Sequence, residues 1–158
     1  MQSQEIANSR PQRKRLPHAL PSWVTPGSRF FISINALPRG GNRLCCNGRA
    51  EALLDGFIHY HVSGDWHPTV ALIMPDHLHA VLAFNPQKSI VSTIASWKGY
   101  HAKRLGIEWQ SGFFDHRLRD EQEEFEKCLY IRQNPVRKEL VDQAEDWPYV
   151  WPKVSIDG

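Results

Sequence analysis

The sequence predicts a single α+β domain with a ferredoxin-like antiparallel sheet, in the order β-α-β-β-α-β, followed by one added C-terminal helix. First, a chain of 158 residues with 41% hydrophobic and 23% charged side chains is typical of one globular domain with its own core. Second, segments with strand-like alternation and segments with helical spacing of apolar residues follow one another in that order. Third, this order is the split β-α-β pattern, which places its helices on one face of the sheet.

The first elements follow from local residue patterns. Residues 29–37 (RFFISINAL) are rich in Phe and Ile and predict a strand, which Pro38 and the following glycines end. Residues 49–63 space their apolar side chains along one face and predict a helix, although Gly56 weakens it. Two strands then flank a tight Met-Pro-Asp corner, and His77 begins the alternating pattern of the second one.

The second half continues with helical spacing over residues 88–105, which Gly106 ends. A short strand is expected over residues 112–118. A third helix begins near Asp120 with acidic residues in its first turns, as the helix dipole favours, and Pro135 is expected to end it. The segment after this helix, with two Trp-Pro steps, is expected to pack back irregularly.

The two ends of the chain differ in composition from the domain. Residues 1–24 form a basic tail with little to bury, residues 25–152 the domain, and residues 153–158 a short C-terminal tail. The net charge is +2, and because the first tail is basic, the rest of the chain has no excess of positive charge. Bulk charge therefore does not indicate a nucleic-acid partner, and any such function has to rest on a local site.

The expected compartment is the cytoplasm. No apolar run approaches the roughly 20 residues that a membrane span needs, and no apolar stretch follows the basic N-terminal residues as in a secretory signal. The cysteines Cys45, Cys46 and Cys128 lack metal-binding or redox spacing, so we expect free thiols in a reducing compartment.

Two histidines form the first candidate site. His77 and His79 flank Leu78 in a predicted strand, so both imidazoles point to the same face. Two neighbouring imidazoles can hold a divalent ion, and they cost stability if they are buried without one. A zinc-bound structural pair in an unrelated α+β domain is an alternative interpretation of this pair.

The added C-terminal helix carries the second candidate site. Tyr130 and Asn134 are four residues apart and would lie one above the other, unless the last turn before Pro135 frays. A phenol, with a pKa of about 10, is a poor nucleophile unless an ion polarises the phosphate that it attacks. Two imidazoles and one amide oxygen would leave coordination positions for phosphate oxygens, and Mg²⁺ or Mn²⁺ suits such ligands. The alternative for Tyr130 alone is an ordinary half-buried helix residue.

Four motifs, MPDHLHAVLAF, SWKGYHAKRL, WQSGFFDHRLRD and YIRQNPVRKELV, occur in this order over roughly residues 28–151. In these motifs the chain resembles the single-tyrosine HUH transposases, above all the REP-associated tyrosine transposases, relatives of the insertion-sequence 200-like enzymes. The resemblance implies a metal-dependent endonuclease and strand transferase that nicks single-stranded DNA near a hairpin. It also implies a 5′-phosphotyrosine intermediate and a free 3′-hydroxyl. By position, His77 and His79 are then the metal-binding histidines, Asn134 the third ligand and Tyr130 the nucleophile.

The resemblance leaves two points open. Relatives often have Asn where this chain has Asp76, which would alter the charge near the metal without changing its ligands. Insertion-sequence relatives are typically dimers that exchange the tyrosine helix, whereas the repeat-associated group is typically monomeric, so both a monomer and a homodimer are possible. A catalytically silent protein that binds hairpin nucleic acid and derives from such a transposase is the alternative function.

Several other residues are candidates of second rank. Trp97 and Trp109 could stack on unpaired bases, although the helical spacing of Trp97 favours the core. His116 and Asp115 could approach the site or be structural. Basic residues on the second and third helices and beside them could neutralise DNA phosphates; they are Lys98, Arg117, Arg119, Arg132, Arg137 and Lys138.

Overall fold

The computed structural model describes residues 20–153 and contains one antiparallel sheet with the strand order β4-β1-β3-β2-β6, in which β5 also pairs with β1. The predicted ferredoxin-like arrangement is confirmed. The predicted tails 1–24 and 153–158 lie largely outside the described residues. The strands are β1 Arg29–Leu37, β2 Trp66–Ile73, β3 His77–Phe84, β4 Glu108–Trp109, β5 Phe114–Leu118 and β6 Val150–Trp151.

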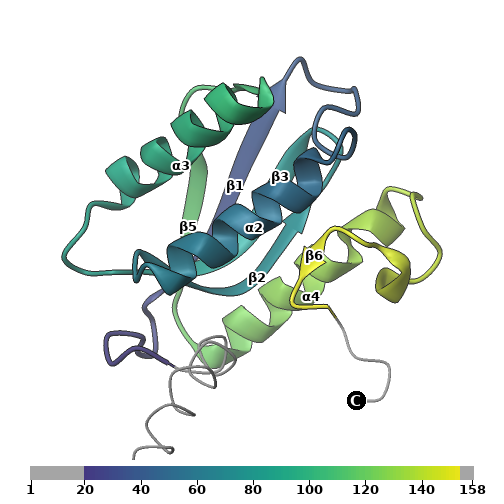
Figure 1. Cartoon of the computed structure of the whole chain (residues 1–158). Coiled ribbons are helices and arrows are strands. Elements are labelled where there is room, and N and C mark those ends of the chain that lie inside the picture. The colour runs from purple at the N-terminus through teal and green to yellow at the C-terminus, as the bar shows by residue number, and fades with distance from the viewer. Residues whose placement is uncertain (1–19, 154–158) are drawn as a thin grey trace, which may run out of the picture.

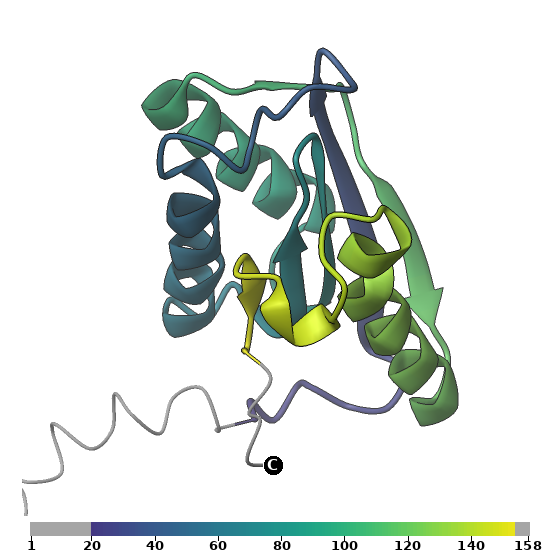
Figure 2. The same ribbon diagram turned by 90° about the vertical axis from the view of Figure 1, so that its right-hand side faces the viewer.

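Helices cover both faces of this sheet (Figures 1 and 2). Helices α2 (Arg49–Val62) and α3 (Ile90–Leu105) lie on one face, as predicted for the β-α-β-β-α-β unit. Helix α4 (Glu121–Arg137) covers the opposite face. A short 3₁₀ helix, η2 (Ala144–Asp146), follows α4.

The register of the central strands decides which residues face α4. Ser33 pairs with His79 and Asn35 with His77 across β1 and β3, and directly paired residues share a face. The residues between them, such as Leu78, point to α2 and α3 and join a core that contains the buried rings of Phe57, Trp66 and Trp97. A smaller core on the other face joins α4 to the sheet; it comprises Phe31, Val70, Leu72, Met74, Val81, Leu118, Ile131, Trp147 and Val150.

The α2–α3 contact explains the glycine in α2. A Cβ atom at Gly56 would lie 2.5 Å from the imidazole of His101, and 3.0 Å from the indole nitrogen of Trp97. The two helices therefore pack at a distance that only glycine permits. Trp97 is fully buried there, which confirms its expected place in the core.

Two expectations about the C-terminal part are wrong. Helix α4 does not end at Pro135 but continues to Arg137. Proline removes only its own N–H donor, and the carbonyls of Asn134 and Pro135 still accept from the N–H groups of Lys138 and Leu140, at 3.0 and 2.9 Å. The following segment is not wholly irregular, because β6 pairs with β2.

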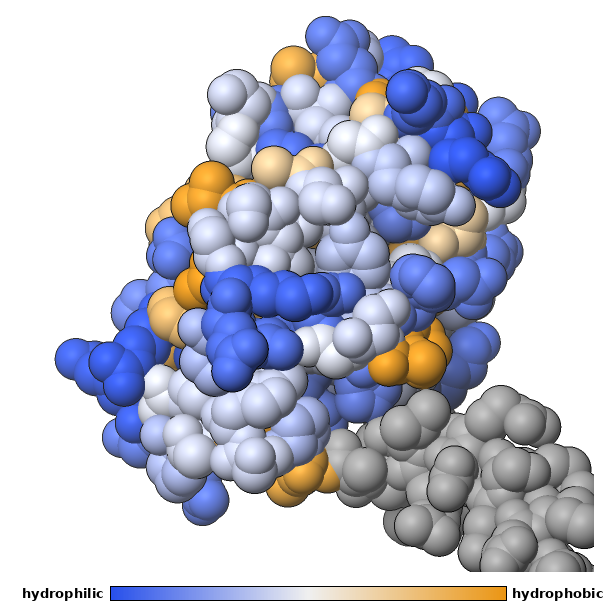
Figure 3. Space-filling view, turned by 60° about the vertical axis from the view of Figure 1, so that its left-hand side comes forward, coloured by the Kyte–Doolittle hydropathy of each residue, from blue (hydrophilic) through white to orange (hydrophobic). Residues whose placement is uncertain are grey.

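All three cysteines are free thiols, as expected. No helix within residues 20–153 is long and apolar enough to cross a membrane. The face in Figure 3 is largely hydrophilic, and its hydrophobic residues are exposed in small separate groups.

Candidate functional site

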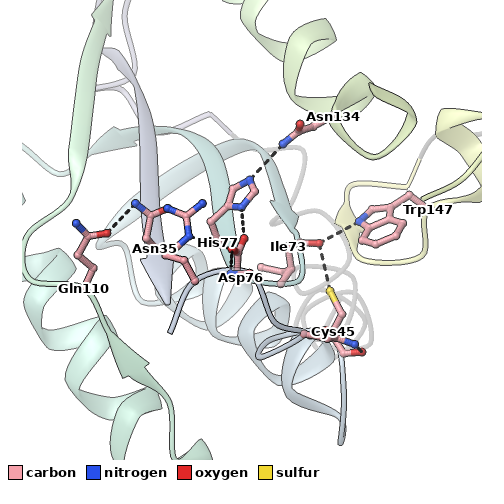
Figure 4. Close-up of polar contacts among 11 residues, drawn as sticks. Asn35, Cys45, Ile73, Asp76, His77, Gln110, Asn134 and Trp147 are labelled. Carbon is pink, nitrogen blue, oxygen red and sulfur yellow. Dashed lines mark hydrogen bonds and ion pairs between the residues drawn. The ribbon is translucent and has the colours of Figure 1, made fainter. Parts of the chain in front are cut away.

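The two histidines of β3 lie side by side beneath α4. Their ring centroids are 4.7 Å apart, with 65° between the ring planes. The shared face predicted from their spacing is confirmed by their pairing with Asn35 and Ser33. Asn35 also donates to the side chain of Gln110 at 3.0 Å, so amide groups extend the polar surface beside His77 (Figure 4).

Asp76 holds the imidazole of His77 in one orientation. Its Oδ1 lies 2.8 Å from Nδ1 of His77, while Oδ2 accepts from Nε of Arg39 at 2.9 Å and from the N–H of Gly40 at 2.8 Å. Burial alone would raise the pKa of Asp76, but the hydrogen bonds from His77, Gly40 and Arg39 hold this pKa well below its ordinary value. An ionised carboxylate only accepts, so Nδ1 of His77 donates and Nε2 keeps its lone pair.

Asn134 meets that lone pair from the other side. Its side chain is 4% exposed, and its amide group lies 3.3 Å from Nε2 of His77 (Figure 4). Rotation of the amide by half a turn exchanges its nitrogen and oxygen, so either atom can occupy this position. The structure therefore brings together two residues that stand 57 positions apart in the chain.

His79 is a neutral imidazole in a partly buried setting. Burial, with the neighbouring charges of His77, Lys127 and Arg137, lowers its pKa to about 3. Its Nδ1 is buried and has no hydrogen-bond partner among the described residues. A neutral imidazole with an unsatisfied nitrogen is suited to bind a metal ion.

The side chains of His77, His79 and Asn134 fit a divalent ion that keeps coordination positions free for a substrate. Within residues 20–153, no three His, Cys, Asp or Glu side chains are clustered to hold an ion. A metal here would be bound by His77, His79 and the amide oxygen of Asn134, without the four-ligand set of a closed structural zinc site. Such a mixed nitrogen and oxygen set is compatible with Mg²⁺ or Mn²⁺ and leaves positions for phosphate oxygens.

Tyr130 lies one helical turn before Asn134 and is 47% exposed. Its hydroxyl has no hydrogen-bond partner in the described part of the chain. The guanidinium of Arg137 lies 4.0 Å from the centroid of its ring, and the ammonium of Lys127 lies 4.9 Å from it. Lys127 also lies 4.5 Å from the ring centroid of Phe31, which packs on His79 with centroids 5.2 Å apart. Phe31 and Lys127 thus connect Tyr130 with the histidine pair.

The predicted basic residues are distributed around the molecule. Lys98 lies on α3, on the face opposite to Tyr130, and donates to two carbonyl groups of the loop between β4 and β5. Arg117 and Arg132 donate to the carbonyls of Gly27 and Pro152, and Arg119 pairs loosely with Glu123. Only two of the six approach the site: Arg137 contacts Tyr130, and Lys138 lines a pocket beside His77. Their contact with DNA stays a prediction.

The second-rank candidates have structural contacts. Trp109 is half-buried, and its indole donates to the carbonyl of Lys98 at 2.9 Å. His116 lies 2.8 Å from a carboxylate oxygen of Glu123. Asp115 pairs with Ile32 and so points away from α4.

Sequence reasoning missed Phe31, Arg39 and Lys127. The alternation of β1 places Phe31 on the face of Ser33, so a correct register would have brought it beside His79. Lys127 stands three residues before Tyr130, a spacing at which helix residues are neighbours. Nothing local pointed to Arg39, which reaches Asp76 across two loops.

No protein-family model matches the chain. It is 28% identical to the REP-associated tyrosine transposase of Escherichia coli K12 over 132 residues, which cover 80% of this chain and 78% of that protein. It is 29% identical over 99 residues to a Haemophilus influenzae protein that carries this name provisionally. That match spans only 56% of the Haemophilus protein and 51% of this chain. The chain is similar in sequence to the REP-associated tyrosine transposases.

Solved structures agree on the fold. A REP-associated tyrosine transposase bound to a REP hairpin superposes with a TM-score of 0.70 at 20% identity, over 89% of this chain and 90% of that one. A provisionally named transposase of Deinococcus radiodurans has a TM-score of 0.51 at 17% identity, over 73% of this chain and 95% of that one. The two sequence relatives confirm the resemblance to REP-associated tyrosine transposases inferred from the motifs, and the solved structures confirm the fold.

Proposed function

We propose that this relative of the REP-associated tyrosine transposases is a metal-dependent endonuclease and strand transferase. Its substrate would be single-stranded DNA next to a hairpin, since one relative is described in complex with a REP hairpin. The observation that carries the proposal is the contact of Asn134 with His77, one helical turn from an exposed tyrosine. This contact supports a metal site and a nucleophile that share one surface.

The residues divide the chemistry between them. His77, His79 and Asn134 would hold Mg²⁺ or Mn²⁺, which supplies polarisation of the scissile phosphate. Tyr130 attacks the phosphorus through its phenolic oxygen, and the bond between phosphorus and the 3′-oxygen breaks. The result is a 5′-phosphotyrosine, and the proton that the phenol loses is balanced by the proton that the leaving 3′-hydroxyl gains. Attack by a 3′-hydroxyl reverses the step and rejoins strands.

The surroundings of His77 favour a polyanionic substrate. A pocket of about 250 Å³ beside His77 is lined by Arg39 and Lys138 together with glycines and apolar side chains. Because Arg39 is paired with Asp76, Lys138 is the cation at its rim that can neutralise a phosphate beside the scissile one. The carboxylate of Asp76, also at this pocket, is already paired with Arg39 and does not present an uncompensated negative charge.

The proposal is tested by trapping the covalent intermediate. A hairpin oligonucleotide with labelled single-stranded flanks is incubated with the protein and Mn²⁺, and the products are separated under denaturing conditions. We expect a protein–DNA adduct that Tyr130→Phe abolishes while hairpin binding is retained. Tyr100→Phe is the matched control, because Tyr100 is also exposed but lies on α3, behind the sheet. An adduct that persists in Tyr130→Phe would refute the assignment of the nucleophile.

One further variant and the wild-type protein test the metal site and the alternative function. His77→Ala should remove metal-dependent cleavage, and undiminished activity would reject the metal site. A wild-type protein that binds the hairpin but forms no adduct with Mg²⁺ or Mn²⁺ would instead be the catalytically silent hairpin-binding protein.

We also propose that one chain is sufficient for the reaction. Ile131 of α4 is buried against the chain's own sheet, so Asn134 and His77 meet within a single molecule. Mixing Tyr130→Phe with His77→Ala protein should therefore give no adduct. Recovery of the adduct in the mixture would show that chains exchange the tyrosine helix in a homodimer.

A further inference from the structure

The ring of Tyr130 lies against two cations. The ammonium of Lys127 and the guanidinium of Arg137 are 4.9 and 4.0 Å from the centroid of its ring. Neither cation forms an ion pair within the described residues 20–153. Cations on an aromatic face are common, but two unpaired cations around one exposed tyrosine form a local positive site that an anion can enter.

The acidic residues of α4 nearest to Lys127 contact other groups. Glu123 contacts His116 and Arg119, Glu124 pairs with Arg29 at 3.3 Å, and Glu126 accepts from Gln122 at 2.8 Å. Helical proximity alone would allow several of them to approach Lys127. The positive charge of Lys127 is therefore left without a partner on its own helix.

The position of Lys127 differs from that of Arg137. Arg137 also donates to the main-chain carbonyl of Tyr130 at 2.7 Å, so its guanidinium holds the ring of Tyr130 against α4. Lys127 donates no hydrogen bond among the described residues and lies between the rings of Tyr130 and Phe31, and Phe31 packs on His79. Its ammonium thus stands between the proposed nucleophile and the proposed metal ligands, with hydrogen-bond donors free.

We propose that Lys127 is a further catalytic residue that binds a nonbridging oxygen of the scissile phosphate, and that Arg137 positions Tyr130. This inference rests on the function proposed above. When the phenolic oxygen bonds to phosphorus and the 3′-oxygen leaves, Lys127 keeps its protons and stabilises the charge on the nonbridging oxygens in the transition state. The phosphodiester charge is the same before and after the step.

The experiment compares single-turnover rates of adduct formation at saturating protein and Mn²⁺. Lys127→Met keeps the apolar stem that packs on Phe31 and Tyr130 but removes the charge. We expect its rate to fall at least tenfold, with hairpin affinity within threefold of wild type. Lys127→Arg keeps a charge within reach and should stay within fivefold of wild type. Lys103→Met is the control for loss of one positive charge, because Lys103 is exposed on α3 behind the sheet.

A second substrate separates catalysis from a structural role. A methylphosphonate at the scissile position lacks the ionised nonbridging oxygen, so wild type and Lys127→Met should react with it at rates within twofold. If the rate difference on this substrate remains tenfold, Lys127 acts only through the fold, and the inference is overturned. It is equally overturned if Lys127→Met reacts with natural DNA as fast as wild type, or if Lys127→Arg is as slow as Lys127→Met.

The two proposals fail in different ways. Absence of any adduct with wild-type protein would contradict the proposed function itself. A wild-type adduct whose rate does not depend on residue 127 would leave that function standing and remove only the role of Lys127. Thermal unfolding of each variant is recorded alongside, and Lys127→Gln replaces Lys127→Met if the latter does not fold.

Discussion

Removal of the Asp76 side chain should weaken the proposed divalent-ion site without unfolding the protein. Asp76 accepts from Nδ1 of His77 at 2.8 Å and thereby keeps the lone pair of Nε2 directed at Asn134. A partner of this kind typically contributes about tenfold to 100-fold to metal affinity. At about 1.4 kcal/mol for each factor of ten, Asp76→Ala should cost about 1.4 to 2.8 kcal/mol of binding free energy. A hydrogen bond to a charged acceptor is worth about 1.5–3 kcal/mol, which agrees with this range.

The measurement is calorimetric titration of metal-free, DNA-free protein with Mn²⁺. Nitrogen-15 NMR of the histidines gives an independent readout, since the proton of His77 should reside on Nδ1 in wild type and redistribute in Asp76→Ala. Asp55→Ala is the matched control, because Asp55 is an exposed carboxylate on α2, behind the sheet. Mn²⁺ affinity within twofold of wild type, with an unchanged tautomer of His77, would refute the reasoning.

Asparagine at position 76 should give an intermediate result. One oxygen of Asp76 serves His77, while the other serves Arg39 and the N–H of Gly40. An amide has only one oxygen, so it can accept from His77 or from the Arg39 side, but not from both. The Mn²⁺ affinity of Asp76→Asn should therefore lie between those of wild type and Asp76→Ala, and an affinity below that of Asp76→Ala would contradict this account.

Three further predictions concern stability and DNA binding. Gly56→Ala should destabilise the protein by about 1–2 kcal/mol in thermal denaturation. A Cβ atom 2.5 Å from the imidazole of His101 costs more free energy through overpacking than alanine gains in helix propensity. Gly99→Ala, whose Cβ meets nothing within 4 Å, should stabilise the protein slightly. Burial, with the charges of His61 and Arg29, lowers the pKa of His67 from 6.5 to about 4. The folded state thus favours neutral His67. The free energy of unfolding should therefore decline by about 3 kcal/mol at most as pH falls from 6.5 to 4. In His67→Phe this decline should be shallower. Phe114 is 59% exposed and packs edge-on against Phe31, so we expect an unpaired base to stack on its ring. Phe114→Ala should then weaken binding of the single-stranded flank by about 1–3 kcal/mol, as measured by fluorescence anisotropy.

Each of these results has a contradicting outcome. A Gly56→Ala protein more stable than wild type would mean that α2 and α3 can move apart at no cost. Identical pH profiles for wild type and His67→Phe would exclude His67 as the source of the decline. Phe125→Ala serves as the control for Phe114→Ala, because Phe125 is comparably exposed on α4, and equal losses in both variants would argue against a specific stacking position.

The histidine pair shows how far local sequence can predict a site. Alternation has a period of two, so the shared face of His77 and His79 follows from their spacing once the strand is recognised. The same local rules predicted the end of α3 at Gly106, whose backbone is left-handed in the structure. These features depend only on neighbours in the chain, and the sequence contains them in full.

Contacts between distant segments could not be predicted in this way. Arg39 reaches Asp76, and β6 completes the edge of β2, through packing that no local pattern encodes. Pro135 is an instructive error, because the rule that proline ends a helix considers only the missing donor and the crowding of the ring against the preceding turn. In the structure the carbonyls on both sides of the missing donor remain bonded, and the helix gains one more half-turn.

The arrangement of the two cores accounts for the position of the site. The large aromatic core beneath α2 and α3 anchors β3, so the backbone that carries His77 and His79 is fixed from behind. The smaller core beneath α4 holds that helix through Ile131, which leaves Tyr130 on the open side and turns Asn134 inward. The proposed ligands His77 and His79 thus stand on the rigid sheet with Asn134 of α4 turned toward them, and the proposed nucleophile Tyr130 stands at the solvent edge of that helix. Such a division suits a reaction in which a fixed ion and a mobile strand have to meet one nucleophile.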